Sequence, residues 1–153
     1  MELSIVIPAF NEEALIQETL ARVSSAFEPY KSQEISWEII VCDNQSTDQT
    51  ASLAEAAGAQ VISESVRQIS QVRNTGAAHA KGTWLLFLDA DSFPCPALVG
   101  EMLELMESSD CIGCGTTVEV QGGTLFNKLR MERLNPVFRL FGVCGGALIL
   151  CRR

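Results

Sequence analysis

The sequence has 153 residues, 47% of them hydrophobic, and a formal net charge of −8. This length and composition predict one folded domain over residues 1–153 and exclude a disordered chain. The negative charge argues against a nucleic-acid partner, whose phosphates it would repel, although a bridging metal could still hold an anionic nucleotide.

Short apolar segments alternate with helical patterns from the start of the chain. Residues 3–7 predict a strand that Pro8 ends, and Asn11, followed by two acids, predicts the N-cap of a helix whose apolar face reaches residue 27. Residues 37–42 predict a second buried strand. Ser46 and Gln49 then predict a capping box for a helix to about residue 57, with Gly58 just past its end.

The alternation continues through the rest of the chain. We expect a strand at residues 59–62, a helix at 70–80, a strand at 83–88 and a helix at 96–108. A strand at 112–120, a helix at 124–140 and an apolar stretch at 143–150 follow. This order predicts an α/β fold with a mainly parallel sheet flanked by helices, in which ligands bind beyond the carboxyl ends of the strands.

Polar clusters follow three of these strands, at residues 9–12, 43–46 and 89–92. Asp89 and Asp91 are two residues apart, so on an extended chain both carboxylates face one point, where they repel unless a cation lies between them. Oxygen ligands of this kind suit Mg²⁺ or Mn²⁺. Taken alone, the pair fits a strand that ends in a solvated turn equally well.

Three further residues could contribute to the same edge of the sheet. Asp43 can accept hydrogen bonds from a nucleobase or ribose, or organise a turn through its own backbone. Arg67, in the predicted loop 63–69, is the better candidate for binding a ligand. Arg73, within a predicted helix, could also pair with a phosphate or stack on a base, or it could be a solvated surface charge. Lys81-Gly82 is interpreted as a helix end.

Together these segments resemble the Rossmann-like nucleotide-binding half of a GT-A glycosyltransferase of the family-two type. The matching segments are residues 4–13 (SIVIPAFNEE), 40–48 (IVCDNQSTD), 73–82 (RNTGAAHAKG) and 85–91 (LLFLDAD). The resemblance covers residues 3 to 100 clearly. It implies transfer of a sugar from a nucleotide-diphosphate donor to an acceptor hydroxyl, with inversion at the sugar and a divalent metal, Mg²⁺ or Mn²⁺.

The resemblance also assigns roles to individual residues. Donor binding is expected at Pro8, Ala9, Phe10, Asn11, Glu12, Asp43, Arg67, Asp89 and Ala90. Asp91 would ligate the metal, and Asp89 would contact the ribose or a metal-bound water. Residues 145–147 (GGA) resemble the strand that lines the acceptor side. No acid after the D-A-D segment stands in the context of the family's catalytic base, so we expect the base beyond Arg153 and a truncated chain.

Other functions fit parts of the sequence. A donor-binding module without transfer activity fits the missing base. Residues 86–92 also resemble the opening motif of haloacid-dehalogenase-like phosphatases, in which the first Asp is a nucleophile. A dinucleotide-binding oxidoreductase fits less well, because no G-x-G-x-x-G follows the first strand. The acceptor (glycan, lipid or small molecule), peripheral membrane contact and a homodimer stay open.

Location and thiol chemistry follow from what the sequence lacks. No apolar run reaches the ~18 residues of a membrane span, and no basic segment precedes an apolar one at the start, so a cytoplasmic protein is expected. Its six cysteines should then be reduced thiols. We interpret Cys111 and Cys114 as buried packing residues and not as a zinc or redox site, since His79 is the only histidine.

Overall fold

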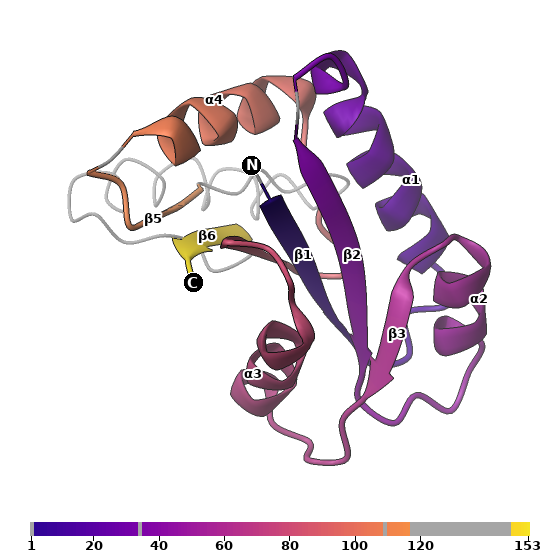
Figure 1. Cartoon of the computed structure of the whole chain (residues 1–153). Helices are drawn as coiled ribbons and strands as arrows, with labels where there is room; N and C mark the ends of the chain where they lie inside the picture. Colours follow the sequence, from indigo (N-terminus) through magenta and orange to yellow (C-terminus); the bar gives the residue numbers. More distant parts are fainter. Residues whose placement is uncertain (1, 34, 109, 117–147) are drawn as a thin grey trace, which may run out of the picture.

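The computed structural model describes residues 2–33, 35–108, 110–116 and 148–153. The described strands form one mixed sheet in the order β3-β2-β1-β4-β6-β5 (Figure 1). The elements are β1 (Glu2–Ala9), α1 (Ile16–Phe27), the 3-10 helix η1 (Glu28–Tyr30), β2 (Ser36–Asp43), α2 (Thr50–Ala56), β3 (Gln60–Ser63), α3 (Ile69–His79), β4 (Trp84–Leu88), α4 (Pro96–Glu107), β5 (Gly113–Gly115) and β6 (Leu148–Arg152).

The first four strands are parallel, as the sequence predicts. Strand β1 pairs with β2 and β4, and β2 pairs with β3, so all four run toward the same end of the sheet. In Figure 1 the arrows of β1, β2 and β3 converge on this end. Strand β6 pairs antiparallel with β4 and β5, so the sheet is mainly parallel with an antiparallel edge. The predicted α/β class is confirmed.

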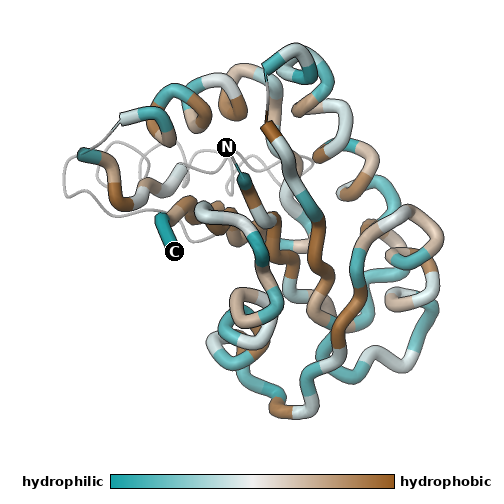
Figure 2. Tube along the Cα trace, viewed as in Figure 1, coloured by the Kyte–Doolittle hydropathy of each residue, from teal (hydrophilic) through white to brown (hydrophobic). Residues whose placement is uncertain are grey.

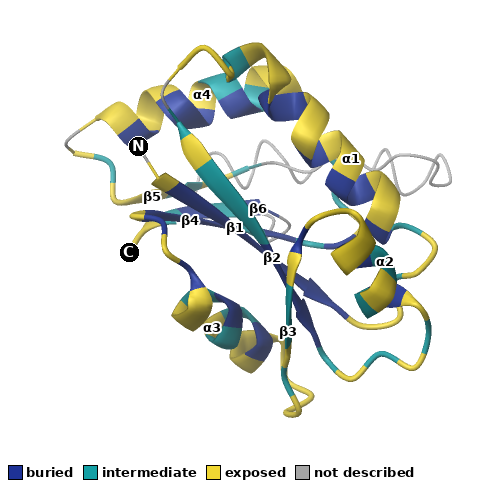
Figure 3. Cartoon of the chain, turned by 45° about the vertical axis from the view of Figure 1, so that its right-hand side comes forward, coloured by how far each residue is buried: buried dark blue, intermediate teal, exposed yellow. Residues whose placement is uncertain are grey.

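Helices cover both faces of the sheet (Figure 3). Helices α1, α2 and α4 cover one face, where Ile5, Ile7 and Leu86 belong to the main apolar core. Helix α3 covers the other face, and its Ala77 lies against the smaller cluster that contains Ile40. Figure 2 shows that apolar segments are concentrated on the strands and the sheet-facing sides of the helices. Both faces of β1 are buried, which explains its continuous apolar sequence.

Several predicted boundaries are wrong. Pro8 does not end β1, which continues to Ala9. Helix α1 begins at Ile16 and has no side-chain cap, although Asn11 was expected to cap it. The capping box of Ser46 and Gln49 does not form either, and α2 begins only at Thr50. In both loops the side chains expected to cap a helix bond to another segment of the chain.

Other boundaries agree within a few residues. Gly58 follows the end of α2 with φ +88°, a conformation that favours glycine. The strand expected at 112–120 is described only as Gly113–Gly115, and the stretch at 143–150 only from Leu148 on. The helix expected at 124–140 and the acceptor-side residues 145–147 lie outside the described residues. No helix in the described part of the chain is long and apolar enough to cross a membrane.

The amino ends of β1 and β2 carry a partly buried polar network. The Ser4 hydroxyl donates to Glu38 Oε1 (2.7 Å) and accepts the Gly82 amide (2.8 Å), while the Lys81 amide donates to the same Glu38 oxygen (2.7 Å). A Cβ on Gly82 would lie 2.6 Å from the Ser4 nitrogen. Lys81-Gly82 is thus more than a helix end, because it ties the start of β4 to β1 and β2.

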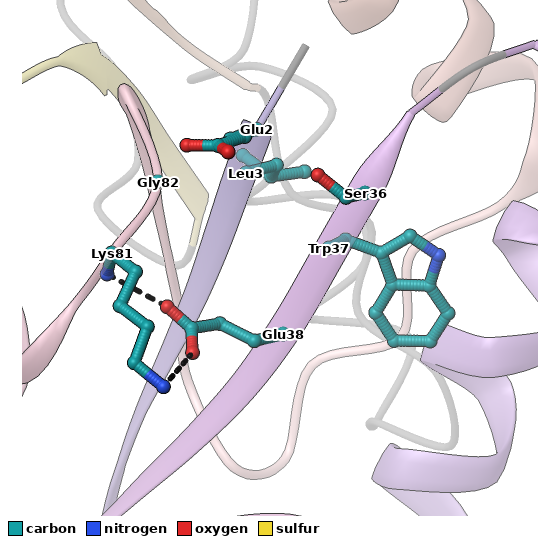
Figure 4. Close-up of a pocket in the computed structure, with 7 residues that line it drawn as sticks. All are labelled: Glu2, Leu3, Ser36, Trp37, Glu38, Lys81 and Gly82. Carbon is teal, nitrogen blue, oxygen red and sulfur yellow. Dashed lines mark hydrogen bonds and ion pairs between the residues drawn. The ribbon is translucent and has the colours of Figure 1, made fainter.

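A shallow pocket lies beside Lys81 and Gly82 (Figure 4). It is at the end of the sheet opposite the predicted site.

Gly76 allows α3 to approach the sheet. A Cβ at this position would lie 2.3 Å from Val6 Cγ1, at the centre of β1. We expect Gly76→Ala to destabilise the protein by about 1–3 kcal/mol through overpacking, despite the better helix propensity of Ala. Urea denaturation measures the change. The double variant Gly76→Ala/Val6→Ala should show a favourable coupling energy, and strictly additive effects would contradict this packing.

Candidate functional site

The loops after β1, β2 and β4 meet at the carboxyl edge of the sheet. Ala9 and Asp43 are register partners at the ends of β1 and β2. The amide of Asn44 donates to the Ala9 carbonyl (2.8 Å), so the hydrogen bonding between the two segments continues one residue beyond the end of β2. Asp89 directly follows β4, which pairs with β1 on its other side. The predicted clustering of three polar segments at one edge is therefore confirmed.

Hydrogen bonds between loops 10–13 and 46–50 hold them together. The Asn11 amide donates to Ser46 Oγ (2.9 Å), and Asn11 Oδ1 accepts the Thr47 amide (2.8 Å). Asn11 has φ +55°, in the left-handed region that Asn tolerates better than most residues. Its side chain therefore supports the neighbouring loop instead of capping α1.

Two further pairs extend this connection. The Glu12 amide donates to Thr50 Oγ1 (2.8 Å), and the Glu13 amide donates to Asp48 Oδ2 (3.2 Å). In the opposite direction, the Gln49 amide donates to Glu13 Oε2 (3.0 Å). Backbone donors of one loop thus bond side chains of the other, and the edge of the site is preorganised.

Asp43 presents an unused acceptor. Only 8% of this residue is exposed, and its Oδ2 accepts the Ser46 amide at 3.2 Å. Its Oδ1 is buried and has no hydrogen-bond partner within the described ranges. A buried carboxylate oxygen without a partner is costly and needs an explanation. A donor group from a ligand would satisfy it. Asp43 therefore both organises its turn and keeps one oxygen available.

Arg67 and Phe10 form one wall of the edge. The Arg67 guanidinium lies 5.0 Å from the centre of the Phe10 ring, and the ring is 44% exposed. The loop that carries Arg67 is tied to β2, because Asn44 Nδ2 donates to the carbonyls of Glu64 (2.8 Å) and Val66 (3.0 Å). An exposed aromatic ring beside a guanidinium is suited to stack on a planar ligand.

The two aspartates of the D-A-D segment differ in their contacts. Asp89 Oδ1 accepts a hydrogen bond from Arg73 Nη2 at 2.7 Å in a partly buried ion pair. Of the alternatives for Arg73, the solvated surface charge is therefore wrong. Asp91 is exposed, and its carboxylate makes no hydrogen bond or ion pair with the described residues. Of these two aspartates, only Asp91 has a carboxylate without a compensating partner among the described residues.

Negative charge accumulates between the loops after β1 and β4. Burial raises the pKa of Glu12 above its ordinary value of 4.5, and the nearby charges of Asp91 and Asp48 raise it further. A divalent cation beside Asp91 would relieve this repulsion. The described residues contain no group of three or more side chains able to hold a metal by themselves. An ion that takes one or two carboxylates together with ligand phosphates, as Mg²⁺ usually does, needs no such group.

The structure brings most of the predicted residues together. Ala9 and Asp43 lie side by side, Phe10 contacts Arg67, and Glu12 lies within electrostatic reach of Asp91. Pro8 and Ala90 are buried, so neither presents an exposed side chain at this edge. Sequence reasoning considered Arg73 as a ligand group but missed its ion pair with Asp89. A charge six residues from Arg67 on a helix that precedes the D-A-D strand was the available signal.

Comparison with known proteins gives consistent results. The model of the family described as "Glycosyl transferase family 2" matches residues 4–149. A dolichol-phosphate mannosyltransferase of Pyrococcus furiosus is 26% identical over 132 residues, and the match covers 83% of this chain and 36% of that protein. The enzyme of the same name from Mycosarcoma maydis is 30% identical over 156 residues, which cover 97% of this chain and 50% of that protein.

The fold has solved counterparts. The mannosyltransferase PcManGT from Pyrobaculum calidifontis, solved with GDP-Man and Mn²⁺, superposes with a TM-score of 0.72 over 99% of this chain and 44% of that one, at 21% identity. This likeness shows the same GT-A fold. The chain spans about a third to a half of the length of the two relatives named above.

Replacing Glu12 tests the electrostatics of the site. We expect Glu12→Gln to stabilise the ligand-free protein at pH 7 by less than about 1 kcal/mol, or at most about 4 °C in Tm, because it removes a carboxylate from beside Asp91 and Asp48. Since the pKa of Glu12 is raised in the folded protein, its destabilising effect appears as the pH rises above 4.5. The gain should therefore vanish below that pH.

Thermal unfolding from pH 4 to pH 8 measures this difference. The matched control is Glu55→Gln, which removes the same charge from an exposed position on α2. An equal gain for both variants, or a gain for Glu12→Gln that persists in acid, would contradict the repulsion at the site.

Proposed function

Because this chain belongs to glycosyl transferase family 2, we propose that its carboxyl edge binds a nucleotide-diphosphate sugar through a divalent metal and transfers the sugar to an acceptor. One observation carries the proposal. Asp43 and Asp91 each keep carboxylate oxygen available, and they stand at the ends of strands separated by β1 alone. Two strand spacings are about 10 Å, comparable with the separation of the base and the diphosphate in a nucleotide.

The nucleoside lies against the loops after β1 and β2 in this proposal. Phe10 and Arg67 stack on the base, since both present planar, exposed groups on one wall. Asp43 Oδ1, buried and without a partner within the described ranges, accepts a hydrogen bond from the base or the ribose. The bonds between loops 10–13 and 46–50 keep this wall in place before the donor arrives.

Asp91 and Asp89 divide the remaining work. Asp91 would hold Mg²⁺ or Mn²⁺, and the ion would supply positive charge to the diphosphate leaving group. Arg73 already occupies Oδ1 of Asp89 and compensates its charge. Asp89 is therefore suited to accept a hydrogen bond from the ribose or a metal-bound water. The Mn²⁺ and GDP-Man bound to PcManGT support this choice of metal and ligand class.

The acceptor and the stereochemistry are part of the proposal. Two relatives are named for dolichol phosphate, so a lipid-linked acceptor is the first to test, at a cytoplasmic membrane surface. Inversion at the sugar follows the sequence resemblance. The described acids Glu101, Glu104 and Glu107 lie on α4 and are not assigned as the catalytic base. The family match over residues 4–149 leaves the phosphatase hypothesis without support.

Two charge-removing variants separate the halves of the donor site. We expect Asp91→Asn to weaken binding of UDP or GDP in the presence of Mn²⁺ by about tenfold or more, while binding of the free nucleoside stays unchanged. Asp43→Asn should weaken nucleoside and diphosphate to a similar extent, with or without Mn²⁺. Isothermal titration calorimetry measures all of these affinities, and Glu55→Gln is the matched control.

The wild-type titrations also test the metal. Mn²⁺ alone should bind weakly, and Mn²⁺ with the diphosphate much more tightly, because the described residues do not complete a coordination shell. Equal affinity for the diphosphate with and without Mn²⁺ would contradict the proposal of a metal-dependent donor site. Binding of an intact nucleotide-sugar without transfer to any lipid-linked, glycan or small-molecule acceptor would favour a donor-binding module.

A further inference from the structure

Helix α1 contacts the D-A-D segment through a buried hydroxyl. Thr19 lies on α1 and is fully buried, and its Oγ1 donates to the Ala90 carbonyl at 2.5 Å across 71 residues of sequence. A buried threonine in a helix commonly bonds a carbonyl of its own preceding turn. Here the hydroxyl bonds the residue between Asp89 and Asp91 instead.

The contacted carbonyl belongs to a tight turn. The Ser92 amide donates to the Asp89 carbonyl at 3.0 Å, which closes a β-turn over residues 89–92. The Ala90–Asp91 peptide is the central peptide of this turn. The two commonest turn types differ mainly in the orientation of that peptide, so a flip would change the direction of the Asp91 backbone and side chain. A donor fixed on the Ala90 oxygen selects one orientation.

Other contacts hold the flanks of the turn and not its centre. Arg73 from α3 holds the Asp89 side chain, and the Arg22 guanidinium lies 4.7 Å from the centre of the Phe93 ring. Arg22 is itself paired with Glu18 one turn earlier on α1. Among the described contacts, Thr19 is the one that reaches the central peptide through its side chain. The exposed Asp91 carboxylate has no such support of its own.

We propose that Thr19 is a positioning residue for the donor's metal: by holding the Ala90 carbonyl, its hydroxyl fixes the turn that aims Asp91 at the ion. The inference rests on the proposed function, because it assigns Asp91 to the metal. It does not require Thr19 to touch the donor. Thr19 would hold a metal ligand in place without touching the ion itself. Loss of a residue with this role costs about 10–100-fold in metal affinity.

A pair of substitutions isolates the hydroxyl. Thr19→Val keeps the branched shape and removes the donor, whereas Thr19→Ser keeps the donor and loses a methyl group. We expect Thr19→Val to weaken Mn²⁺-dependent binding of UDP or GDP by about tenfold, and to leave the free nucleoside unaffected. Thr19→Ser should stay within about twofold of the wild type, since its hydroxyl can make the same bond. Calorimetry measures both ligands, and circular dichroism confirms folding.

A second readout needs no metal. In ¹⁵N-labelled protein without ligand, Thr19→Val should shift the amide resonance of Asp91 and speed hydrogen exchange at Ser92, while the amides of the 46–50 loop stay in place. Thr19→Ser should leave both signals near their wild-type values. If Thr19→Val does not fold, Thr19→Cys, whose thiol is a much weaker donor, takes its place in both measurements.

The outcomes separate this inference from the proposed function. Equal metal-dependent affinities for Thr19→Val and the wild type, or equal losses for Thr19→Val and Thr19→Ser, would overturn the positioning role. Wild-type protein that binds no diphosphate with Mn²⁺ would overturn the proposed function instead. The Asp91 amide then decides the role of Thr19: an unchanged resonance in Thr19→Val refutes it, and a selective shift supports it.

Discussion

Strand β1 pairs in parallel with β2 on one side and β4 on the other, and the site depends on this arrangement. Because parallel strands end at the same edge, Ala9, Asp43 and Asp89 reach one edge from segments up to 80 residues apart in sequence. Both faces of β1 are buried between the helices that cover the sheet. The same strand that forms the centre of the core therefore sets the spacing of the polar residues.

Charge is distributed unequally over this edge. Arg73 compensates Asp89, and hydrogen bonds engage Asp48, while Asp91 and one oxygen of Asp43 stay available within the described residues. Burial raises the pKa of Glu12, and repulsion from the neighbouring carboxylates of Asp91 and Asp48 raises it further. In a protein of net charge −8, a cation between this acidic edge and a diphosphate would offset their repulsion, which ties the metal to the ligand in the proposal.

The elements were predictable from the sequence, because their apolar periodicity reflects burial on one or both faces. The apolar strands around Ile5, Ile40 and Leu86, and the polar residues after them, were placed correctly. The loops were not, because Asn11 and Ser46 have the side chains of helix caps but bond each other's loops. Local sequence cannot distinguish these uses. The ion pair of Arg73 with Asp89 and the bond of Thr19 to Ala90 likewise exist only after the sheet has formed.

The position of the metal is the central claim, and paramagnetic broadening by Mn²⁺ tests it most directly. In ¹⁵N-labelled protein saturated with UDP or GDP, added Mn²⁺ should broaden the amide signals of Glu12, Ala90 and Asp91 first. The amides of Ser36 and Gly82, at the opposite end of the sheet beside the pocket in Figure 4, should stay sharp. Broadening at Ser36 and Gly82 with sharp signals at Glu12 and Asp91 would contradict the account.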